Sequence, residues 1–423
     1  MKLPLLLLAL ALPASAQTVS TPAASSDSYD LTRCFELAKK QSESLRVSAA
    51  QIDEVVQQYR QVLGAIVPNL AFSYSRKYQD TSSSSGSNSY LFENPQPNGY
   101  FSLTQPLFSG LREYAEMASF KHQEAAGGLA LKHATTALYG DVAQSFYLVL
   151  QLESELANVR SVIDQSTVRL KELRQREDLG KSRRSEVVLA ESQEAGFESQ
   201  AAALTGQIAV ARSGLSLLTG RDMSASPLVD SLGTVAPSSL DAALSRADER
   251  SDVRALRERV LSAEDDVRVS KGAWYPTLGL TGDYYVQRTH TLKPIHWDAT
   301  FALALPLFSG GSQAAQLRQA KDKEAEAQES WSFQRRQARA EVRQAYAQLV
   351  AALSEASAAK TSYEKAAEGY QLQTREYRLG LVNNLDVLQT LSTMLDAKKT
   401  FDAVAIQSKL DYLDLQVSSE ELP

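Results

Sequence analysis

The chain has 423 residues, of which 43% are hydrophobic and 22% are charged, and its formal net charge is −6. Such a balance is ordinary for a folded protein, and the excess of acidic residues gives no reason to expect nucleic acid as a partner. Outside the first residues there is no continuous run of about 20 apolar residues, so the sequence predicts no helical membrane span.

The N-terminal residues have the pattern of an export signal. A basic residue precedes the apolar run Leu3–Leu12, which is followed by the small-residue site Ala14-Ser15-Ala16. We expect residues 1–16 to be a signal peptide that is cleaved after this site, because the apolar run is too short for a membrane anchor. Residues 17–29 are rich in Ser, Thr and Ala and are expected to form a flexible tail.

A five-residue phrase, Pro-Leu-Phe-Ser-Gly, occurs at Pro106–Gly110 and again at Pro306–Gly310, an offset of 200. The same offset relates Leu179-Gly180 to Leu379-Gly380. Such self-similarity indicates two copies of one structural unit. In each copy we place the phrase where a strand gives way to a long helix, so that Pro106, Gly110, Pro306 and Gly310 mark the strand-to-helix junctions.

The sequence divides into a first copy at 30–220, a linker at 221–239 that carries Pro, Gly and Ser, and a second copy at 240–423. Each copy is expected to contain a helix, two strands, a long helix, a tip turn and a returning helix. The expected bounds are strands at about 68–78 and 99–108, a long helix at 110–178 and a tip turn at 179–184, then strands at about 276–288 and 296–308, a long helix at 311–378 and a tip turn at 379–384.

The four expected strands alternate between large apolar and small or polar residues. In the first strand, Leu70, Phe72 and Tyr74 are separated by Ala71 and Ser73. Because successive side chains of a strand point to opposite faces, each strand has one apolar and one polar face. This pattern fits transmembrane strands and also a soluble sheet that buries one face. The polar loop at 81–89 favours the membrane interpretation, because it suits an extracellular loop.

Four strands are too few to close a barrel, since the smallest transmembrane barrels have about eight. An open sheet edge in lipid would leave backbone groups without hydrogen bonds. If the strands lie in the membrane, several chains must therefore contribute them to one closed, cyclic assembly. The helices at 110–178 and 311–378 would each extend roughly 100 Å, and their apolar residues recur at the coiled-coil period.

Together these features resemble the TolC-type outer-membrane efflux proteins over essentially the whole mature length. The most family-specific part is Tyr377-Arg378-Leu379-Gly380 followed by Leu385-Asp386-Val387-Leu388. The resemblance implies a mostly α-helical homotrimer whose strands, four from each chain, form one twelve-stranded β-barrel in the outer-membrane lipid of a Gram-negative bacterium. A coiled-coil α-barrel would continue this β-barrel into the periplasm.

The same resemblance implies an exit duct that exports drugs, metals or proteins. Such a duct works with a periplasmic adaptor and an inner-membrane transporter of the RND, ABC or MFS type. It needs no cofactor and carries out no catalytic chemistry, because the transporter supplies the energy. The implied gate lies at the two tip turns, which form the periplasmic entrance.

Residues of the gate are carried over by position. Asp386 matches an acid that lines the constriction, and Gln389 stands where the family has a second acid. Tyr377 matches a gate tyrosine, and Glu186 matches the acid that this tyrosine bonds. A ring of carboxylates at a narrow point favours cations. An acid in the first turn of a helix is also stabilised by the helix dipole alone, and both interpretations stay open for Asp386.

A tip arginine of well-known family members is Val382 in this chain. Our hypothesis is that Arg183 and Arg184 replace it and pair with Glu186 or Asp386. A solvated basic turn would explain these two arginines equally well.

The glycines of the two tips fit the ends of helices. Their exposure at the tips also makes Gly180 and Gly380, with the neighbouring Lys181 and Leu381, the expected contacts with the adaptor.

Other classes of protein fit the sequence less well. The four histidines, His122, His133, His290 and His296, form no metal-ligand spacing, and no phosphate-binding loop or nucleophile elbow is present, so an enzyme is not indicated. A soluble periplasmic coiled-coil scaffold or adaptor would explain the long helices but not the four amphipathic strands. Cys34 is the only cysteine, which excludes an intrachain disulfide and leaves a helical thiol.

Overall fold

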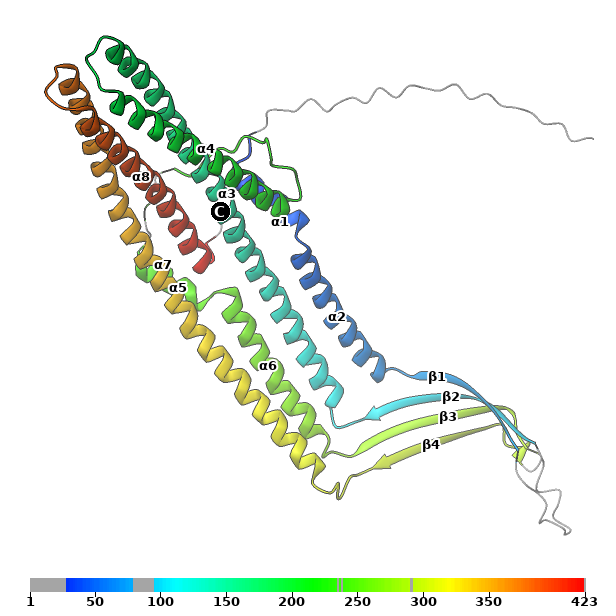
Figure 1. Ribbon diagram of the computed structural model, residues 1–423. Coiled ribbons are helices and arrows are strands. Elements are labelled where there is room, and N and C mark those ends of the chain that lie inside the picture. The colour runs from blue at the N-terminus through cyan, green and yellow to red at the C-terminus, as the bar shows by residue number, and fades with distance from the viewer. Residues whose placement is uncertain (1–27, 79–94, 234–235, 237–238, 290–291, 422–423) are drawn as a thin grey trace, which may run out of the picture.

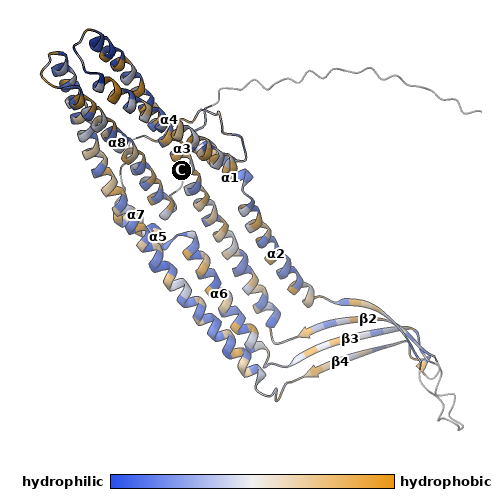
Figure 2. Cartoon of the chain, viewed as in Figure 1, coloured by the Kyte–Doolittle hydropathy of each residue, from blue (hydrophilic) through white to orange (hydrophobic). Residues whose placement is uncertain are grey.

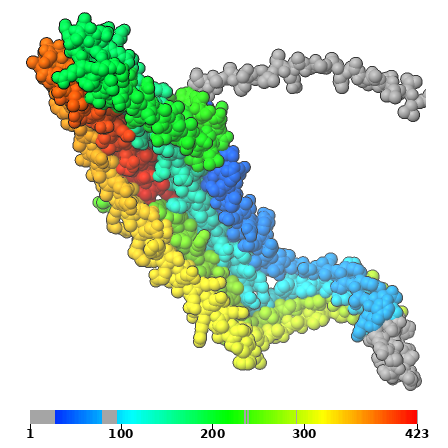
Figure 3. Space-filling view, in the orientation of Figure 1, coloured from blue at the N-terminus to red at the C-terminus, as the bar shows by residue number. Residues whose placement is uncertain are grey.

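The structure is a computed structural model that describes residues 28–78, 95–233, 236, 239–289 and 292–421. The expected signal peptide, most of the expected tail and the polar loop at 81–89 lie outside these residues. The chain is elongated, with two helical tips at one end and a four-stranded sheet at the other (Figure 1). Figure 3 shows a thin molecule whose sheet projects at an angle from the helices.

Both copies of the repeat contain the same elements in the same order. The first copy has α1 (Leu31–Gln41), α2 (Glu43–Ile66), β1 (Asn69–Lys77), β2 (Gln96–Phe108), α3 (Arg112–Asp178) and α4 (Arg184–Thr219). The second has α5 (Leu240–Asp248), α6 (Ser251–Gly272), β3 (Thr277–Gln287), β4 (Trp297–Ala304), α7 (Ser312–Arg378) and α8 (Asn384–Ser418). The expected mostly helical class with a small β part and two repeats is thereby confirmed. At 67 residues each, α3 and α7 extend roughly 100 Å.

The first helix of each copy is interrupted, which the sequence did not predict. Ser42 separates α1 from α2, and its side chain caps α2 by accepting a hydrogen bond from the Leu45 N–H at 3.3 Å. Arg250 takes the same place between α5 and α6, in an extended backbone conformation. The expected flexible tail also ends earlier than 29, because Tyr29 is buried and pairs with Leu228 in a parallel bridge.

The sheet has the order β1-β2-β3-β4, and each pair of neighbours is antiparallel. Its register repeats between the copies: Leu70 pairs with Leu103 as Leu278 pairs with Leu303. This register places the large apolar side chains of all four strands on one face and Ser, Thr, Asn and Asp on the other. Bands of both kinds alternate along the strands in Figure 2.

The fourth strand is shorter than expected, because β4 ends at Ala304 whereas β2 continues to Phe108. The residues at the end of β2 pair with β3, but β4 is an edge strand in a single chain. Leu307 and Phe308, which follow β4, are 88% and 90% exposed. Such exposed apolar side chains are expected where an edge strand lacks a neighbouring strand.

The largest core lies where α1, α3, α4 and α8 meet, about halfway along the molecule. Cys34 is fully buried there, and burial raises the pKa of its thiol to about 11. The expectation of a helical thiol agrees with its position in α1.

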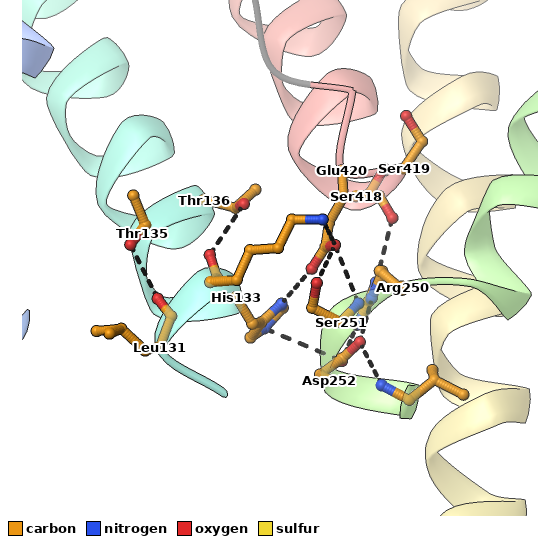
Figure 4. A network of polar contacts seen from close by, with 12 residues as sticks. Leu131, His133, Thr135, Thr136, Arg250, Ser251, Asp252, Ser418, Ser419 and Glu420 are labelled. Carbon is orange, nitrogen blue, oxygen red and sulfur yellow. Dashed lines mark hydrogen bonds and ion pairs between the residues drawn. The ribbon is translucent and has the colours of Figure 1, made fainter. Parts of the chain in front are cut away.

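A polar cluster ties the end of α8 to α3 and α6 (Figure 4). Glu420 has a positive φ of 52° and accepts hydrogen bonds from the N–H and the hydroxyl of Ser251, at 3.0 and 2.7 Å. His133 on α3 lies 3.2 Å from the same carboxylate, and Lys132 lies 3.7 Å from it. We call His133, Glu420 and Ser251 the C-terminal clasp. These bonds offset the steric cost of a non-glycine residue in the left-handed region.

Candidate functional site

Nothing in the described part of the chain covers the apolar face of the sheet. Leu70, Phe72, Trp297, Phe301 and Leu303 are each between 58% and 71% exposed. A soluble sheet would bury such a face, since its side chains favour removal from water. The exposed face instead has the chemistry of a surface that lies against lipid, with a polar opposite face that suits a water-filled interior.

At the other end, the two long helices stop at identical turns. Gly180 and Gly380 have φ of 67° and 76°, a left-handed conformation that glycine adopts without strain. The following N–H groups close the same pattern in both: Lys181 bonds the Arg176 carbonyl at 2.7 Å, and Leu381 bonds the Glu376 carbonyl at 3.0 Å. This arrangement is a Schellman motif, which satisfies the last carbonyls of each helix.

The first tip is not stabilised by the expected arginine pairs within one chain. The Glu186 carboxylate accepts a hydrogen bond from the Ser182 hydroxyl at 2.7 Å. Arg184 lies 3.5 Å from the Glu177 carboxylate, not against Glu186 or Asp386. Arg183 is exposed and precedes α4 without a side-chain cap. Within one chain, Arg184 pairs with Glu177 and Ser182 bonds Glu186, and the pairing of Arg183 or Arg184 with Glu186 or Asp386 stays a prediction for the assembled protein.

The second tip is closed by a capping box. The Asn383 side chain accepts from the Asp386 N–H at 3.0 Å, and the Asp386 carboxylate accepts from the Asn383 N–H at 3.2 Å. Asp386 is half-buried, and Gln389 is exposed one turn further along α8. A helix-capping role for Asp386 is thus established by geometry.

Tyr377 joins the two helical hairpins of a chain. Its ring lies between two arginines of α3, with the guanidinium carbons of Arg169 and Arg176 at 4.7 and 4.8 Å from the ring centroid. The same ring packs on an apolar cluster that includes Leu173 and Val187. Tyr377 therefore contacts the first hairpin through its ring and two cations, not through Glu186.

Two further residues at this place were missed by the sequence reasoning. Arg169 donates from Nε and Nη2 to the side-chain oxygen of Asn384, at 3.0 and 2.8 Å. Both residues are buried, and burial lowers the pKa of Arg169. The sequence does distinguish these two positions, because the corresponding residues of the other copy are Gly369 and Arg184.

A membrane-facing sheet joined to helices of roughly 100 Å defines a membrane-anchored duct subunit. A family model described as "Outer membrane efflux protein" matches residues 35–221 and 243–416. The chain belongs to this family of outer-membrane efflux proteins, which are transport channels and not enzymes. Its helices and strands serve the outer-membrane exit of an efflux pathway, with the helical part in the periplasm. The soluble-scaffold alternative gains no support.

Individual relatives agree with this assignment. The outer membrane protein TolC of Salmonella enteritidis is 23% identical over 397 residues, covering 88% of this chain and 78% of the relative. The solved structure of the outer membrane protein VceC from Vibrio cholerae has a TM-score of 0.77 at 20% identity, and 92% and 94% of the two chains are covered. That of the CmeC outer membrane channel of Campylobacter jejuni has a TM-score of 0.80 at 15% identity, with 92% and 85% covered.

One helix in the described part of the chain, α4, is by length and composition apolar enough to cross a membrane. Polar residues are scattered along α4, so it contains no continuous run of about 20 apolar residues. Composition of this kind is weak support for a membrane span, and α4 packs along α3 far from the sheet (Figure 1). Its exposed apolar residues include Val210 and Leu217, at 74% and 81%.

Proposed function

We propose that three copies of this chain form one duct, in which twelve strands close a β-barrel through the outer membrane and the helices continue it into the periplasm. The observation that carries the proposal is the sheet, which has an exposed apolar face and two unpaired edges, β1 and β4. Pairing β4 with β1 of the next copy removes both edges, as lipid requires. Three copies give a barrel of a size that outer-membrane proteins use.

Two glycine pairs support this assembly. In one chain, a Cβ on Gly110 would lie 2.3 Å from the Gly272 carbonyl oxygen, so α3 and α6 approach each other at a point where only glycines fit. The repeat predicts the same approach between Gly310 and Gly64. Both have open space around them in one chain. The second contact is complete only when α7 of one copy meets α2 of the next.

The gate of the proposed duct lies at the tips. A symmetric assembly repeats Asp386 in every copy, and a ring of carboxylates at a narrow entrance favours cations. Gln389 lies on the same helix without adding charge. Tyr377 joins the hairpins and Glu186 supplies a second acid, so both belong to the residues that set the closed state. Arg183 and Arg184 add positive charge beside that acid.

The tips are also the proposed contact with a periplasmic adaptor, which links channels of the TolC type to an inner-membrane transporter. Gly180 and Gly380 form the outermost turns together with Lys181 and Leu381, and Leu381 is 71% exposed. Two similar turns in each of three copies would offer an adaptor six docking positions. The transporter is of the RND, ABC or MFS type.

Assembly is tested by a glycine substitution that harms only the trimer. Gly64→Leu should leave the isolated chain folded, because its Cβ meets open space, but should block contact with the next copy. Gly128→Leu is the matched control, since Gly128 is also helical with open space around it. Outer-membrane fractions run on unheated gels should show a heat-sensitive oligomer for the wild type and for Gly128→Leu only. An oligomer that tolerates Gly64→Leu would contradict the proposal.

A further inference from the structure

The turn that joins α6 to β3 carries two exposed aromatic side chains. Trp274 and Tyr275 are 50% and 56% exposed. Their N–H groups bond the carbonyls of Lys271 and Gly272, at 3.1 and 3.2 Å, so the backbone of this turn is fixed. Because the helices lie in the periplasm, this end of the sheet lies at the periplasmic leaflet of the membrane (Figure 1). Exposed Trp and Tyr are enriched at this level, where lipid headgroups meet the hydrocarbon.

Two cations lie beside these aromatic residues. Lys271 is the residue before the end of α6, and Arg112 is the first residue of α3. A Cβ on Gly272 would lie 2.3 Å from the Cγ of Arg112, so the stem of Arg112 rests on this glycine, next to Lys271. Both cations are exposed, and neither has an ion-pair partner among the described residues.

The other charged groups near the turn are already bonded within the chain. Arg268, one turn earlier on α6, lies 2.6 Å from the Asp265 carboxylate. The half-buried carboxylate of Glu113 accepts a hydrogen bond from the Ser109 hydroxyl. Arg112 and Lys271 are therefore the groups that an external anion can reach.

The apolar face of the sheet begins next to the two cations. Phe108, the last residue of β2, pairs with Leu278 of β3, and it is 37% exposed four positions before Arg112. A molecule that binds here thus meets cations, aromatic rings and an apolar wall in sequence. An anionic headgroup with acyl chains has the same order of chemistry.

The other copy of the repeat shows that the turn itself does not need these side chains. Gly272 corresponds to Gly64, and Gly110 corresponds to Gly310, so the backbone arrangement is shared. The counterparts of the two cations and the two aromatic residues are small or aliphatic and carry no charge: Ser312, Leu63, Ile66 and Val67. The cationic and aromatic character belongs to one junction of each chain.

We propose that Arg112 and Lys271 bind the phosphate of an anionic phospholipid of the periplasmic leaflet, with Trp274 and Tyr275 at the level of its headgroup and its acyl chains against Phe108. A guanidinium offers paired N–H groups to phosphate oxygens, and an ammonium adds a point charge. A zwitterionic headgroup carries its own cation, which competes with both groups. All five residues belong to one chain, so the site does not depend on the number of copies in the duct.

Lipid binding to the purified, detergent-solubilised channel tests the two cations. The probes are phosphatidylglycerol and phosphatidylcholine with the same acyl chains, and native mass spectrometry measures the bound lipid. Arg112→Gln with Lys271→Gln should weaken binding of phosphatidylglycerol by roughly fivefold for each cation removed, and should leave phosphatidylcholine unchanged. Lys39→Gln with Lys40→Gln is the matched control, because it removes two exposed cations of α1, far from the sheet (Figure 1).

Fluorescence quenching tests the position of the lipid. In Trp297→Phe with Trp331→Phe, Trp274 is the only tryptophan left of three. At equal mole fraction, brominated phosphatidylglycerol should quench it more than brominated phosphatidylcholine. Arg112→Gln with Lys271→Gln should abolish this difference, whereas the exchange Arg112→Lys with Lys271→Arg should keep it.

Three results would overturn the inference. The first is equal quenching of Trp274 by the two brominated lipids while Arg112 and Lys271 are intact. The second is a preference for phosphatidylglycerol that survives the loss of both cations. The third is an equal loss of that preference in the α1 control, which would reduce the effect to the net charge of the protein.

Discussion

The sheet and the helical tips use the internal repeat in opposite ways. In the sheet, both copies keep the same chemistry: Leu70 facing Leu103 becomes Leu278 facing Leu303. At the tips, the buried Arg169 corresponds to Gly369, and a buried amide corresponds to an exposed arginine. A barrel wall needs equivalent strands all round, whereas a gate needs contacts that hold and contacts that release. Sequence divergence between the copies is therefore found at the proposed gate.

The largest expected effect comes from a charge on the lipid-type face of the sheet. Leu303→Arg should destabilise the membrane-inserted state by about 2–4 kcal/mol if the residue lies near the bilayer centre. Thr300→Arg, on the opposite face of the same strand, should be tolerated because that face lines water. The heat-sensitive oligomer in outer-membrane fractions reports the difference. Equal tolerance of both variants would remove the distinction between the faces.

At the tips, Arg169→Leu should cost about 1–3 kcal/mol, because it leaves the buried Asn384 oxygen without a donor. The double variant Arg169→Leu with Asn384→Leu should recover most of this loss, since no buried polar group then remains unpaired. Urea-induced unfolding, monitored by proteolytic release of the tips, measures the stability of the single and the double variant. If the double variant is as unstable as the single variants combined, the pair does not act as a unit.

The C-terminal clasp should depend on pH. Its hydrogen bond to Glu420 raises the pKa of His133 above the ordinary 6.5, against the effect of burial. Burial alone would raise the pKa of Glu420, but hydrogen bonds from His133 and Ser251 lower it below 4.5. The cluster also includes Asp252, which pairs with Arg250 at 2.5 Å, while Arg250 bonds Glu341 of α7 at 2.7 Å.

The contribution of His133 is complete below pH 6.5 and is lost as the pH rises through its raised pKa. The contribution of the carboxylate is complete above pH 4.5 and is lost as the pH falls through its lowered pKa. The clasp should therefore be most stable between pH 4.5 and pH 6.5, where both contributions are complete. Hydrogen exchange at residues 411–420 should be roughly threefold faster at pH 8 than at pH 5.5 after correction for intrinsic rates, a modest effect because His133 is partly exposed.

Two substitutions test whether the clasp causes this pH dependence. His133→Gln should abolish the pH dependence, and Glu420→Gly, which suits the positive φ, should raise exchange at both pH values. His122→Gln is the control, because His122 is on the same helix and lies 2.6 Å from a different carboxylate, Glu258. A pH dependence that survives His133→Gln would show that another group is responsible.

A further effect on stability is expected from Asp386. Asp386→Ala removes half of a capping box and should cost about 1 kcal/mol. Its effect on conduction should be larger than its effect on stability, with altered single-channel conductance and reduced preference for cations in bilayers. Glu186→Gln tests the other tip. Unchanged conductance and selectivity in Asp386→Ala would leave Asp386 as a cap alone.

Much of the fold was accessible from the sequence, because alternation and periodicity act locally. The period-2 pattern of Leu70, Phe72 and Tyr74 predicted the apolar face that the register then made continuous. The interruption at Ser42 was missed because a capping serine looks like any polar helix residue until the next helix changes direction. The Arg169–Asn384 pair was missed because its members are 215 positions apart. Only packing of the two hairpins brings them together.

A closed barrel requires that β4 of one copy pairs with β1 of the next. Within a chain Leu103 faces Gly282, and the repeat places Leu303 opposite Tyr74 of the partner subunit. Leu303→Cys combined with Tyr74→Cys should therefore give disulfide-linked dimers and trimers on oxidation in outer membranes, whereas Leu303→Cys with Ser75→Cys should not. Monomers alone from the first pair, or equal cross-linking of both pairs, would contradict the closed barrel.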